Sequence, residues 1–231
     1  MNYYPETSLP DLNCVQLPFD HLLSIESKKE LLGNLNIAKY SKKEMIFRQN
    51  TRTSHVMFIK SGHVKIFKEG RGDRSVILNI GSTGNFIGLM SVFGEKLHQY
   101  SASSITNCEI CEIDFGIFKS MLLDNSKYAI QLLNTLSLDG LFIFRKLESI
   151  THKQLPGRIA EVILYFSEEI YKSKRYAFPF TRRELAELAG TTKESFIRTL
   201  SEFKNDKIIS LKGSEIEIIS MDIVKTLSAL G

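Results

Sequence analysis

The chain has 231 residues, of which 43% are hydrophobic and 10% aromatic, so it can fill a folded core and is not expected to be disordered. Its formal net charge of +4 permits nucleic-acid binding without requiring it. No apolar run approaches the roughly 18 residues of a membrane span, and the polar N-terminal residues lack a secretion signal. Three cysteines do not make a disulfide framework. We therefore expect a protein of the cytoplasm that is not bound to a membrane.

The N-terminal half alternates short apolar runs with turn residues. Before it, Ser-Lys-Lys-Glu at 27–30 is a capping-box pattern that predicts the start of a short helix. The glycine-rich stretch 70–74 is interpreted as a hairpin turn. Short strands at regular spacing with glycine punctuation predict an antiparallel barrel or sandwich. The apolar runs are 44–47, 56–59, 64–67, 76–80, 86–87 and 109–113.

Residues 125–150 change to helical periodicity. A helix of this length would extend about 37 Å and carry more apolar surface than one small barrel can cover. We interpret the excess as a dimer seam, although the helix could also pack wholly within its own chain. Gln-Leu-Pro-Gly at 154–157 breaks the pattern, and a second helix is predicted over 158–171. The expected seam residues are Leu132, Leu136, Ile143 and Leu147.

Residues 178–219 carry the most informative pattern. Thr-Arg-Arg-Glu at 181–184 is a capping box that opens a helix, and Gly190 ends this helix because glycine accepts a positive φ. Thr-Thr-Lys-Glu at 191–194 is interpreted as a second capping box, which opens a helix that runs through Phe203. Two short helices joined by a tight turn form a helix-turn-helix.

The second of these helices has two chemically different sides. Glu194 and Arg198 are four residues apart and share one side. Arginine can bond guanine bidentately and glutamate can accept from cytosine, so this side suits base edges in the major groove. The alternative is an ordinary Glu–Arg pair on a solvated face, but the strand, glycine turn and strand over 208–219 add a wing and favour DNA binding. The apolar side is expected to hold Phe196, Ile197, Leu200 and Phe203.

Three stretches, 57–65, 84–88 and 185–198, resemble the family of the cyclic-AMP receptor protein and FNR (CRP/FNR). The likeness runs over nearly the whole chain. It implies an α+β fold with an N-terminal jelly-roll, cyclic-nucleotide-binding-like β-barrel, a long dimerisation helix and a C-terminal winged helix-turn-helix. The corresponding segments are 1–124, 125–150 and 151–231.

The resemblance also implies which residues touch DNA. Glu194 and Arg198 occupy the family's principal base-reading positions. Lys193 and Ile197 fall where members of the family vary, so the half-site is expected to differ from those of the namesakes. The implied phosphate contacts are Thr181, Thr192 and Ser195.

The cyclic-nucleotide cassette is where the chain departs from the family. Leu89 follows Gly88 where the cassette has a ribose-binding glutamate, and Tyr100 stands where it has a phosphate-binding arginine. Without a cation beside it, the negative charge of a buried cyclic phosphate would lose its hydration and gain no ion pair in return. We therefore expect that cyclic AMP is not the effector, and that the pocket takes another small molecule or none. The expected pocket residues are Gly88, Leu89, Met90, Tyr100 and Ser101.

Neither a metal nor a cofactor is expected. A cluster of the FNR type needs four cysteines, three of them clustered near the N-terminus, and only Cys14 lies there. Cys108 and Cys111 have the spacing of a metal pair, but on a strand this odd spacing turns them to opposite faces. The alternative function is a haem-based gas- or redox-sensing regulator with the same DNA-binding domain. His98 is its one suggestive histidine, and a solvated loop histidine is the simpler interpretation.

The chain is not expected to be an enzyme, because it has no nucleophile motif, phosphate-binding loop or dinucleotide fingerprint. The sequence therefore predicts a homodimeric bacterial transcriptional regulator that reads an inverted-repeat operator. Its expected partners are double-stranded DNA, a second copy of the chain and RNA polymerase.

Overall fold

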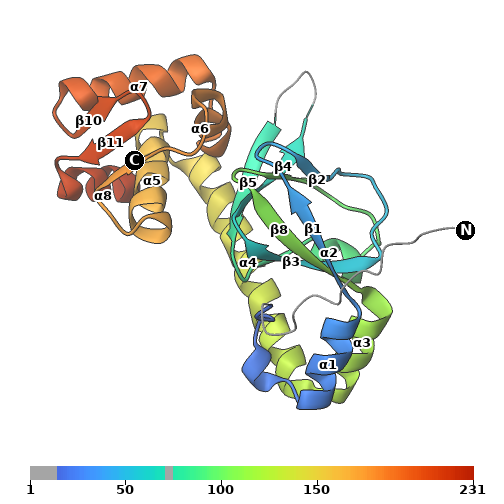
Figure 1. Cartoon of the computed structure of the whole chain (residues 1–231). Helices are drawn as coiled ribbons and strands as arrows, with labels where there is room; N and C mark the ends of the chain where they lie inside the picture. Colours follow the sequence, from blue (N-terminus) through green and yellow to red (C-terminus); the bar gives the residue numbers. More distant parts are fainter. Residues whose placement is uncertain (1–14, 71–74) are drawn as a thin grey trace, which may run out of the picture. The chain divides into compact units, whose positions relative to one another are not determined.

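The computed structural model describes residues 15–70 and 75–231 (Figure 1). The chain divides into two compact units, and the boundary falls inside the long helix α4 (Ser126–His152), between Leu138 and Asp139. The N-terminal unit holds the described residues up to Ile66 and Ile80–Leu138, and the C-terminal unit holds the described residues of Phe67–Asn79 and Asp139–Gly231. The segments predicted from the sequence divide the chain by element rather than by compactness, and they stay a prediction.

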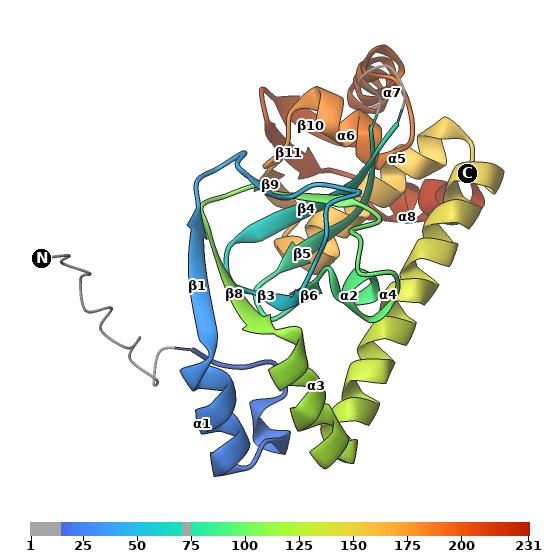
Figure 2. The same ribbon diagram turned by 90° about the vertical axis from the view of Figure 1, so that its right-hand side faces the viewer.

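Two four-stranded sheets form the N-terminal jelly-roll, in the orders β1-β8-β3-β6 and β2-β7-β4-β5. Figure 2 labels the four strands of the first sheet. In the first sheet, β8 pairs antiparallel with both β1 and β3. The strands are β1 (Leu35–Tyr40), β2 (Met45–Phe47), β3 (His55–Ser61), β4 (His63–Glu69), β5 (Ser75–Ser82), β6 (Phe86–Ile87), β7 (Ser101–Ser104) and β8 (Cys108–Asp114).

Side chains from both sheets fill the space between them. Ile59 and Ile110 are directly opposite each other in the β3–β8 ladder, so they share the inner face and are fully buried. Phe47 and Ala102, a cross-strand pair of the other sheet, complete this inner cluster. The alternation of inward and outward residues therefore accounts for the sandwich.

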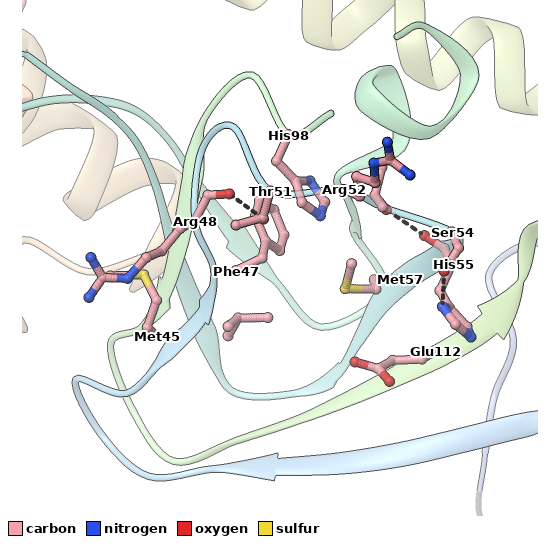
Figure 3. A pocket seen from close by; sticks show the side chains of 12 residues that line it. Met45, Phe47, Arg48, Thr51, Arg52, Ser54, His55, Met57, His98 and Glu112 are labelled. Atoms are coloured by element: carbon pink, nitrogen blue, oxygen red, sulfur yellow. Dashed lines mark hydrogen bonds between the residues drawn. The ribbon is translucent and has the colours of Figure 1, made fainter. Parts of the chain in front are cut away.

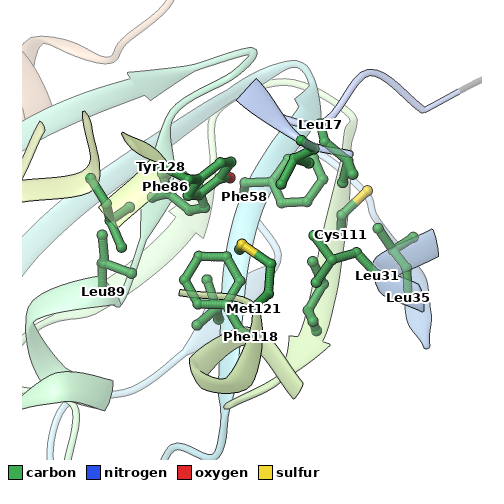
Figure 4. Packing of buried hydrophobic residues seen from close by; sticks show 14 of the residues in the cluster. Leu17, Leu31, Leu35, Phe58, Phe86, Leu89, Cys111, Phe118, Met121 and Tyr128 are labelled. Atoms are coloured by element: carbon green, nitrogen blue, oxygen red, sulfur yellow. The ribbon is translucent and has the colours of Figure 1, made fainter. Parts of the chain in front are cut away.

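Helices cover the outer face of the β1-β8-β3-β6 sheet (Figures 1 and 4). They are α1 (Ile25–Gly33), α3 (Phe115–Asp124) and the first half of α4. Phe58 of β3, Phe118 of α3 and Tyr128 of α4 are buried in this outer cluster. The Tyr128 hydroxyl donates to the carbonyl of Pro18 at 2.9 Å, which ties the segment before α1 to α4.

The two described cysteines lie on opposite faces of β8, as the odd spacing predicts. Cys108 belongs to the inner cluster and Cys111 to the outer one. Burial raises the pKa of the Cys111 thiol to about 12, so this side chain packs as a small, uncharged group. Cys14 lies outside the described residues.

The start of α1 differs from the prediction. Ser24, in extended conformation, is the N-cap and its side chain accepts from the amide of Ser27 at 3.1 Å. The capping box predicted at 27–30 is therefore wrong by about one turn, because two serines lie close enough to the helix start for either to cap it. Of the predicted hairpin turn 70–74, residues 71–74 lie outside the described part of the chain.

The C-terminal unit continues from α4 through α5, which begins three residues earlier than predicted. Pro156 fits the first turn of α5 because the amide it lacks would have no helical partner there. The predicted second helix ends as a π-helical segment, η3, around the buried Phe166. The sheet order is β10-β11-β9. The elements are α5 (Leu155–Leu164), η3 (Tyr165–Ile170), β9 (Arg175–Ala177), α6 (Arg182–Leu188), α7 (Lys193–Asn205), β10 (Ile209–Lys212), β11 (Glu215–Ile218) and α8 (Met221–Leu230).

The predicted α+β class, with a jelly-roll, a long helix and a winged helix-turn-helix, is confirmed. Within the described residues, no helix has both the length and the apolar character that a bilayer span needs.

Candidate nucleic-acid interface and effector pocket

The helix-turn-helix is built from two capped helices and a glycine turn. Thr181 caps α6 with both halves of a capping box, since its own amide also donates to the Glu184 carboxylate at 2.9 Å. Gly190 follows α6 with φ of 63°. The first capping box and the glycine stop are thus confirmed. The second cap is Thr192, one residue later than predicted, and its hydroxyl accepts from the amide of Ser195 at 3.2 Å.

Helix α7 docks through an apolar back. Phe196, Leu200 and Phe203 are buried against the rest of the unit. Ile197 is 40% exposed, so the predicted apolar side is wrong for this residue. At 100° per residue Ile197 lies midway between Leu200 and Glu194, at the border of the two faces. Its exposure is compatible with the DNA-contacting position that the resemblance implies.

The face of α7 opposite its buried side, here called its front, carries charged side chains. Lys193, Glu194 and Arg198 are exposed. Among the described residues, the side chains of Glu194 and Arg198 have no hydrogen-bond or ion-pair partner, so they do not form the i,i+4 pair that was the alternative to base reading. The hydroxyls of Thr181 and Thr192 are exposed as well, although each is also part of its helix cap.

The wing is the β10–β11 hairpin. Ile209 pairs with Ile218 and Lys212 with Glu215, and Gly213 turns the chain with φ of 62°. Ile216 and Ile218 face the core, whereas residues 212–215 are exposed. The predicted strand, glycine turn and strand are confirmed.

The last turns of α4 pack on the helix-turn-helix within the C-terminal unit. The Lys146 ammonium donates to the carbonyl of Leu188 at the end of α6. Burial lowers the pKa of Lys146 to about 8. Ser149 donates to the Glu161 carboxylate of α5. Polar contacts therefore join the end of the long helix to α5 and α6.

The predicted effector residues lie in different surroundings. Gly88, with φ of 74°, donates its amide to the Tyr100 hydroxyl at 3.0 Å. Leu89 is 3% exposed and belongs to the outer core cluster, whereas Met90 is exposed. The buried Ser101 hydroxyl accepts from the amide of Gln49 at 2.9 Å. The chain's own groups thus satisfy the polar atoms at the position of the cassette.

His98 is buried rather than solvated, which corrects the simpler interpretation from the sequence. Its ring is 2% exposed and stacks on Phe47 with centroids 3.8 Å apart. Its backbone is held by the 50–51 segment, with His98 donating to Thr51 at 2.9 Å and accepting from Asn50 at 2.7 Å. Burial lowers the pKa of the imidazole to about 4, so the ring is neutral. Sequence reasoning missed this burial because it depends on Phe47, which is distant in the sequence.

A separate cavity of about 400 Å³ lies beside this stack (Figure 3). His98, Phe47 and Met57 line it together with Glu112 of β8. Arg52 lines it as well. None of the five predicted effector residues is among the residues that line this cavity. Within the described residues, no cluster of three or more histidine, cysteine or acidic side chains suits a metal ion.

Comparison with known proteins assigns both parts of the chain. Residues 37–125 match the cyclic nucleotide-binding domain, and residues 157–226 match the Crp-like helix-turn-helix domain. The cAMP-activated global transcriptional regulator CRP of Salmonella typhimurium is 22% identical over 191 residues, which are 81% of this chain and 91% of that protein. The structure of FixK2 from Bradyrhizobium japonicum superposes with a TM-score of 0.77 at 19% identity and covers 85% of this chain and 98% of that one. The c-di-GMP responsive global regulator CLP of Xanthomonas campestris superposes with a TM-score of 0.73 at 22% identity, over 84% and 99% of the two chains.

The burial of a neutral His98 predicts a loss of stability in acid. The imidazole titrates near 6.5 in the unfolded chain and near 4 in the folded protein, so the unfolded state binds more protons between these values. The free energy of unfolding of the wild type should therefore fall, relative to His98→Phe, by about 3 kcal/mol between pH 7 and pH 4. Phenylalanine keeps the stacking on Phe47 but cannot titrate.

Urea denaturation of the two proteins across this pH range measures the difference. His55→Phe removes an exposed histidine from the lining of the same cavity and serves as the control. Parallel stability curves for the wild type and His98→Phe would contradict the assignment of a neutral, buried imidazole.

Proposed function

Because the chain belongs to the CRP/FNR family of transcriptional regulators, a family of DNA-binding proteins and not of enzymes, we propose that it binds an inverted-repeat operator as a homodimer and answers a signal other than cyclic AMP. The observation that carries the proposal is the front of α7, where Glu194 and Arg198 are exposed and unpaired within the described residues. RNA polymerase is the proposed protein partner.

Helix α7 reads bases through its charged front in this proposal. An arginine can donate two bonds to guanine O6 and N7, and a glutamate can accept from cytosine N4. Since neither side chain is held by a protein partner, no intramolecular bond must break when DNA binds. Lys193, Ile197 and Ser195 flank this pair and adjust the half-site. The first-turn amides behind the Thr192 cap, together with Thr181, supply phosphate contacts.

The dimer seam in this proposal is the exposed apolar stripe of α4. Leu132 is buried in the core of its own chain and Leu136 packs partly against the same core, so these two predicted residues offer little to a partner. Ile143 and Leu147 are exposed. The exposed stripe recurs at spacings of three and four, as in a helix pair. It comprises the exposed residues Ile130, Leu133, Ser137, Phe144 and Leu147 and the half-buried Gly140.

The effector in this proposal is not cyclic AMP. The ribose-binding carboxylate is replaced by Leu89, which is part of the core, and the Gly88 amide already donates to Tyr100. A cyclic nucleotide would have to displace this hydroxyl and would find no arginine for its phosphate. The c-di-GMP responsive regulator CLP has a similar fold at 22% identity, so this fold does not by itself specify the ligand.

The second candidate is a haem-sensing regulator, and one observation favours it. His98 is a neutral imidazole beside a cavity, and its ring nitrogen Nδ1 is buried without a hydrogen-bond partner within the described part of the chain. Against haem, one ring face of His98 is covered by Phe47 and its edge lies against Gly88. A Soret band in the purified protein, lost in His98→Phe, would replace the first candidate with this one.

Replacing Arg198 by alanine should weaken operator binding by about 1–3 kcal/mol while changing the affinity for random duplex much less, because the guanidinium would read a base. Fluorescence anisotropy at one fixed salt concentration, on a duplex selected from genomic fragments and on a random one, measures both losses. Lys204→Ala removes a charge from the far end of the same helix and is the control. Equal losses on both duplexes would show that Arg198 contacts only phosphate.

Charging the exposed stripe should break the dimer. Phe144→Glu combined with Leu147→Glu places carboxylates on residues that are 68% and 58% exposed, so the fold of the single chain should survive. Sedimentation at micromolar concentration is expected to show a dimer for the wild type and a monomer for the variant, with loss of tight binding to the inverted repeat. Leu123→Glu charges an exposed leucine of α3 and should change neither result. A monomeric wild type that still binds palindromic DNA tightly would exclude the seam.

Calorimetric titration should give no dissociation constant below about 10 μM for cyclic AMP or cyclic GMP, since each missing charge-assisted bond costs about 1.5–3 kcal/mol. Tyr100→Arg removes the hydroxyl that occupies the Gly88 amide and restores a cation. This variant should therefore bind cyclic AMP roughly tenfold or more tightly than the wild type. Tighter binding by the wild type than this limit would show that the cassette is functional.

A further inference from the structure

Arg182 joins the first helix of the helix-turn-helix to the tip of the wing. It is the first residue of α6, and its Nη2 donates to the carbonyl of Gly213 at 2.5 Å. The same guanidinium lies over the ring of Phe178, 5.7 Å from its centroid. The amide of Phe178 in turn donates to the carbonyl of Ser214 at 3.0 Å. Two neighbouring residues of the wing tip are therefore held by the segment that opens α6.

The tip needs such a support because its own hairpin provides little. β10 and β11 pair over four residues each, and a short two-stranded hairpin is only marginally stable in water. β9 pairs with β11 at residues 215–217, up to the residue that follows the turn, so the turn residues Gly213 and Ser214 lie just beyond the strand pairing. Lys212, Gly213 and Ser214 are exposed, and no atom lies within 4 Å of where a side chain at Gly213 would begin.

The neighbouring arginine shows the contrast. Arg183 instead donates its Nε to the Glu187 carboxylate of its own helix at 3.3 Å. The two arginines thus carry the same charge in the same helical turn, and the bond to the Gly213 carbonyl comes from Arg182.

We propose that Arg182 is a positioning residue that holds the wing tip beside α7, so that Lys212 and the amides of the turn are already placed for a DNA phosphate when the recognition helix enters the major groove. The inference rests on the DNA binding proposed above. It adds that Arg182 holds the wing in a fixed position relative to the recognition helix, so that both can contact the same DNA. A guanidinium suits this role because its planar fork can donate to a carbonyl while its face lies on an aromatic ring. If the tip is already ordered in the free protein, DNA binding does not have to offset the conformational entropy that ordering the tip would cost.

The test compares Arg182→Ala, Arg183→Ala and Lys212→Ala, alone and combined, in the full-length protein. Each substitution removes one positive charge, so a purely electrostatic loss should be the same for the two arginines. If Arg182 positions the wing, Arg182→Ala should lower the affinity for operator and random duplex alike by two- to tenfold more than Arg183→Ala does. Lys212→Ala should then weaken binding clearly in the wild type and much less in the Arg182→Ala background.

Amide hydrogen exchange of residues 211–215 in the free protein supplies a readout that needs no DNA. It should be faster in Arg182→Ala than in Arg183→Ala, with Arg182→Met, which keeps an aliphatic stem over Phe178, as a second variant if the alanine protein unfolds. Equal losses for the two arginines, with Lys212→Ala additive in both backgrounds, would overturn the proposal. If the wild type fails to bind DNA but the exchange difference persists, the positioning contact stands and the proposed function fails instead.

Discussion

The turn at Gly190 is the constraint on which the DNA-binding surface depends. Its φ of 63° lets α6 end and the chain reach the Thr192 cap within three residues. A Cβ at this position would lie 3.2 Å from Cγ1 of Ile150, so the absence of a side chain also sets how closely α4 approaches the turn. Lys146 satisfies the carbonyl of Leu188, one of the carbonyls that the end of α6 leaves without a helical partner. One glycine therefore lies between α6, α7 and the last turns of α4, and a larger residue there would strain the positive φ and press on the Ile150 side chain.

The N-terminal unit uses a left-handed glycine in the same way, with a different outcome. At Gly88 the space of the missing side chain is taken by the edge of His98, whose Cε1 would lie 3.1 Å from a Cβ, and the amide is taken by Tyr100. Gly190 lies against Ile150 of helix α4, whereas Gly88 lies against His98 and Tyr100 of its own domain. A polar site that is satisfied internally gains little from a ligand, because each new hydrogen bond must replace one that already exists. An effector that acts here would have to displace Tyr100, whereas one in the cavity beside Phe47 would not.

Local rules predicted most of the C-terminal unit from the sequence. The capping box at Thr181, the stop at Gly190 and the turn at Gly213 each depend on backbone preferences of a few consecutive residues, and all three are found. The cap positions were less predictable: Ser24 was missed in favour of Ser27, and Thr192 in favour of Thr191, because adjacent hydroxyls can cap equally well and the tertiary structure selects between them. Strand β7 shows where strand prediction from apolar alternation fails. Its sequence, Ser-Ala-Ser-Ser, has no apolar alternation, and it becomes a strand because Ala102 pairs with Phe47 of β2.

The sequence does not predict which apolar residues become buried, and helix α4 shows why. Periodicity predicts that the helix has more apolar residues than one core can cover, but a stripe that faces the core and one that faces outward repeat at the same spacing of three and four. Leu132 and Leu133 are adjacent, about 100° apart around the helix, and only the fold decides that the first is 3% exposed and the second 61%. The same holds for His98, which is an unremarkable loop histidine until Phe47 stacks on it. A helix with two apolar stripes at this offset can pack on its own domain with one and on a second helix with the other. Ser137 and Gly140 in the middle of the outer stripe would let the two backbones of a dimer approach closely, so the seam proposed for α4 follows from the residues that the core leaves outside.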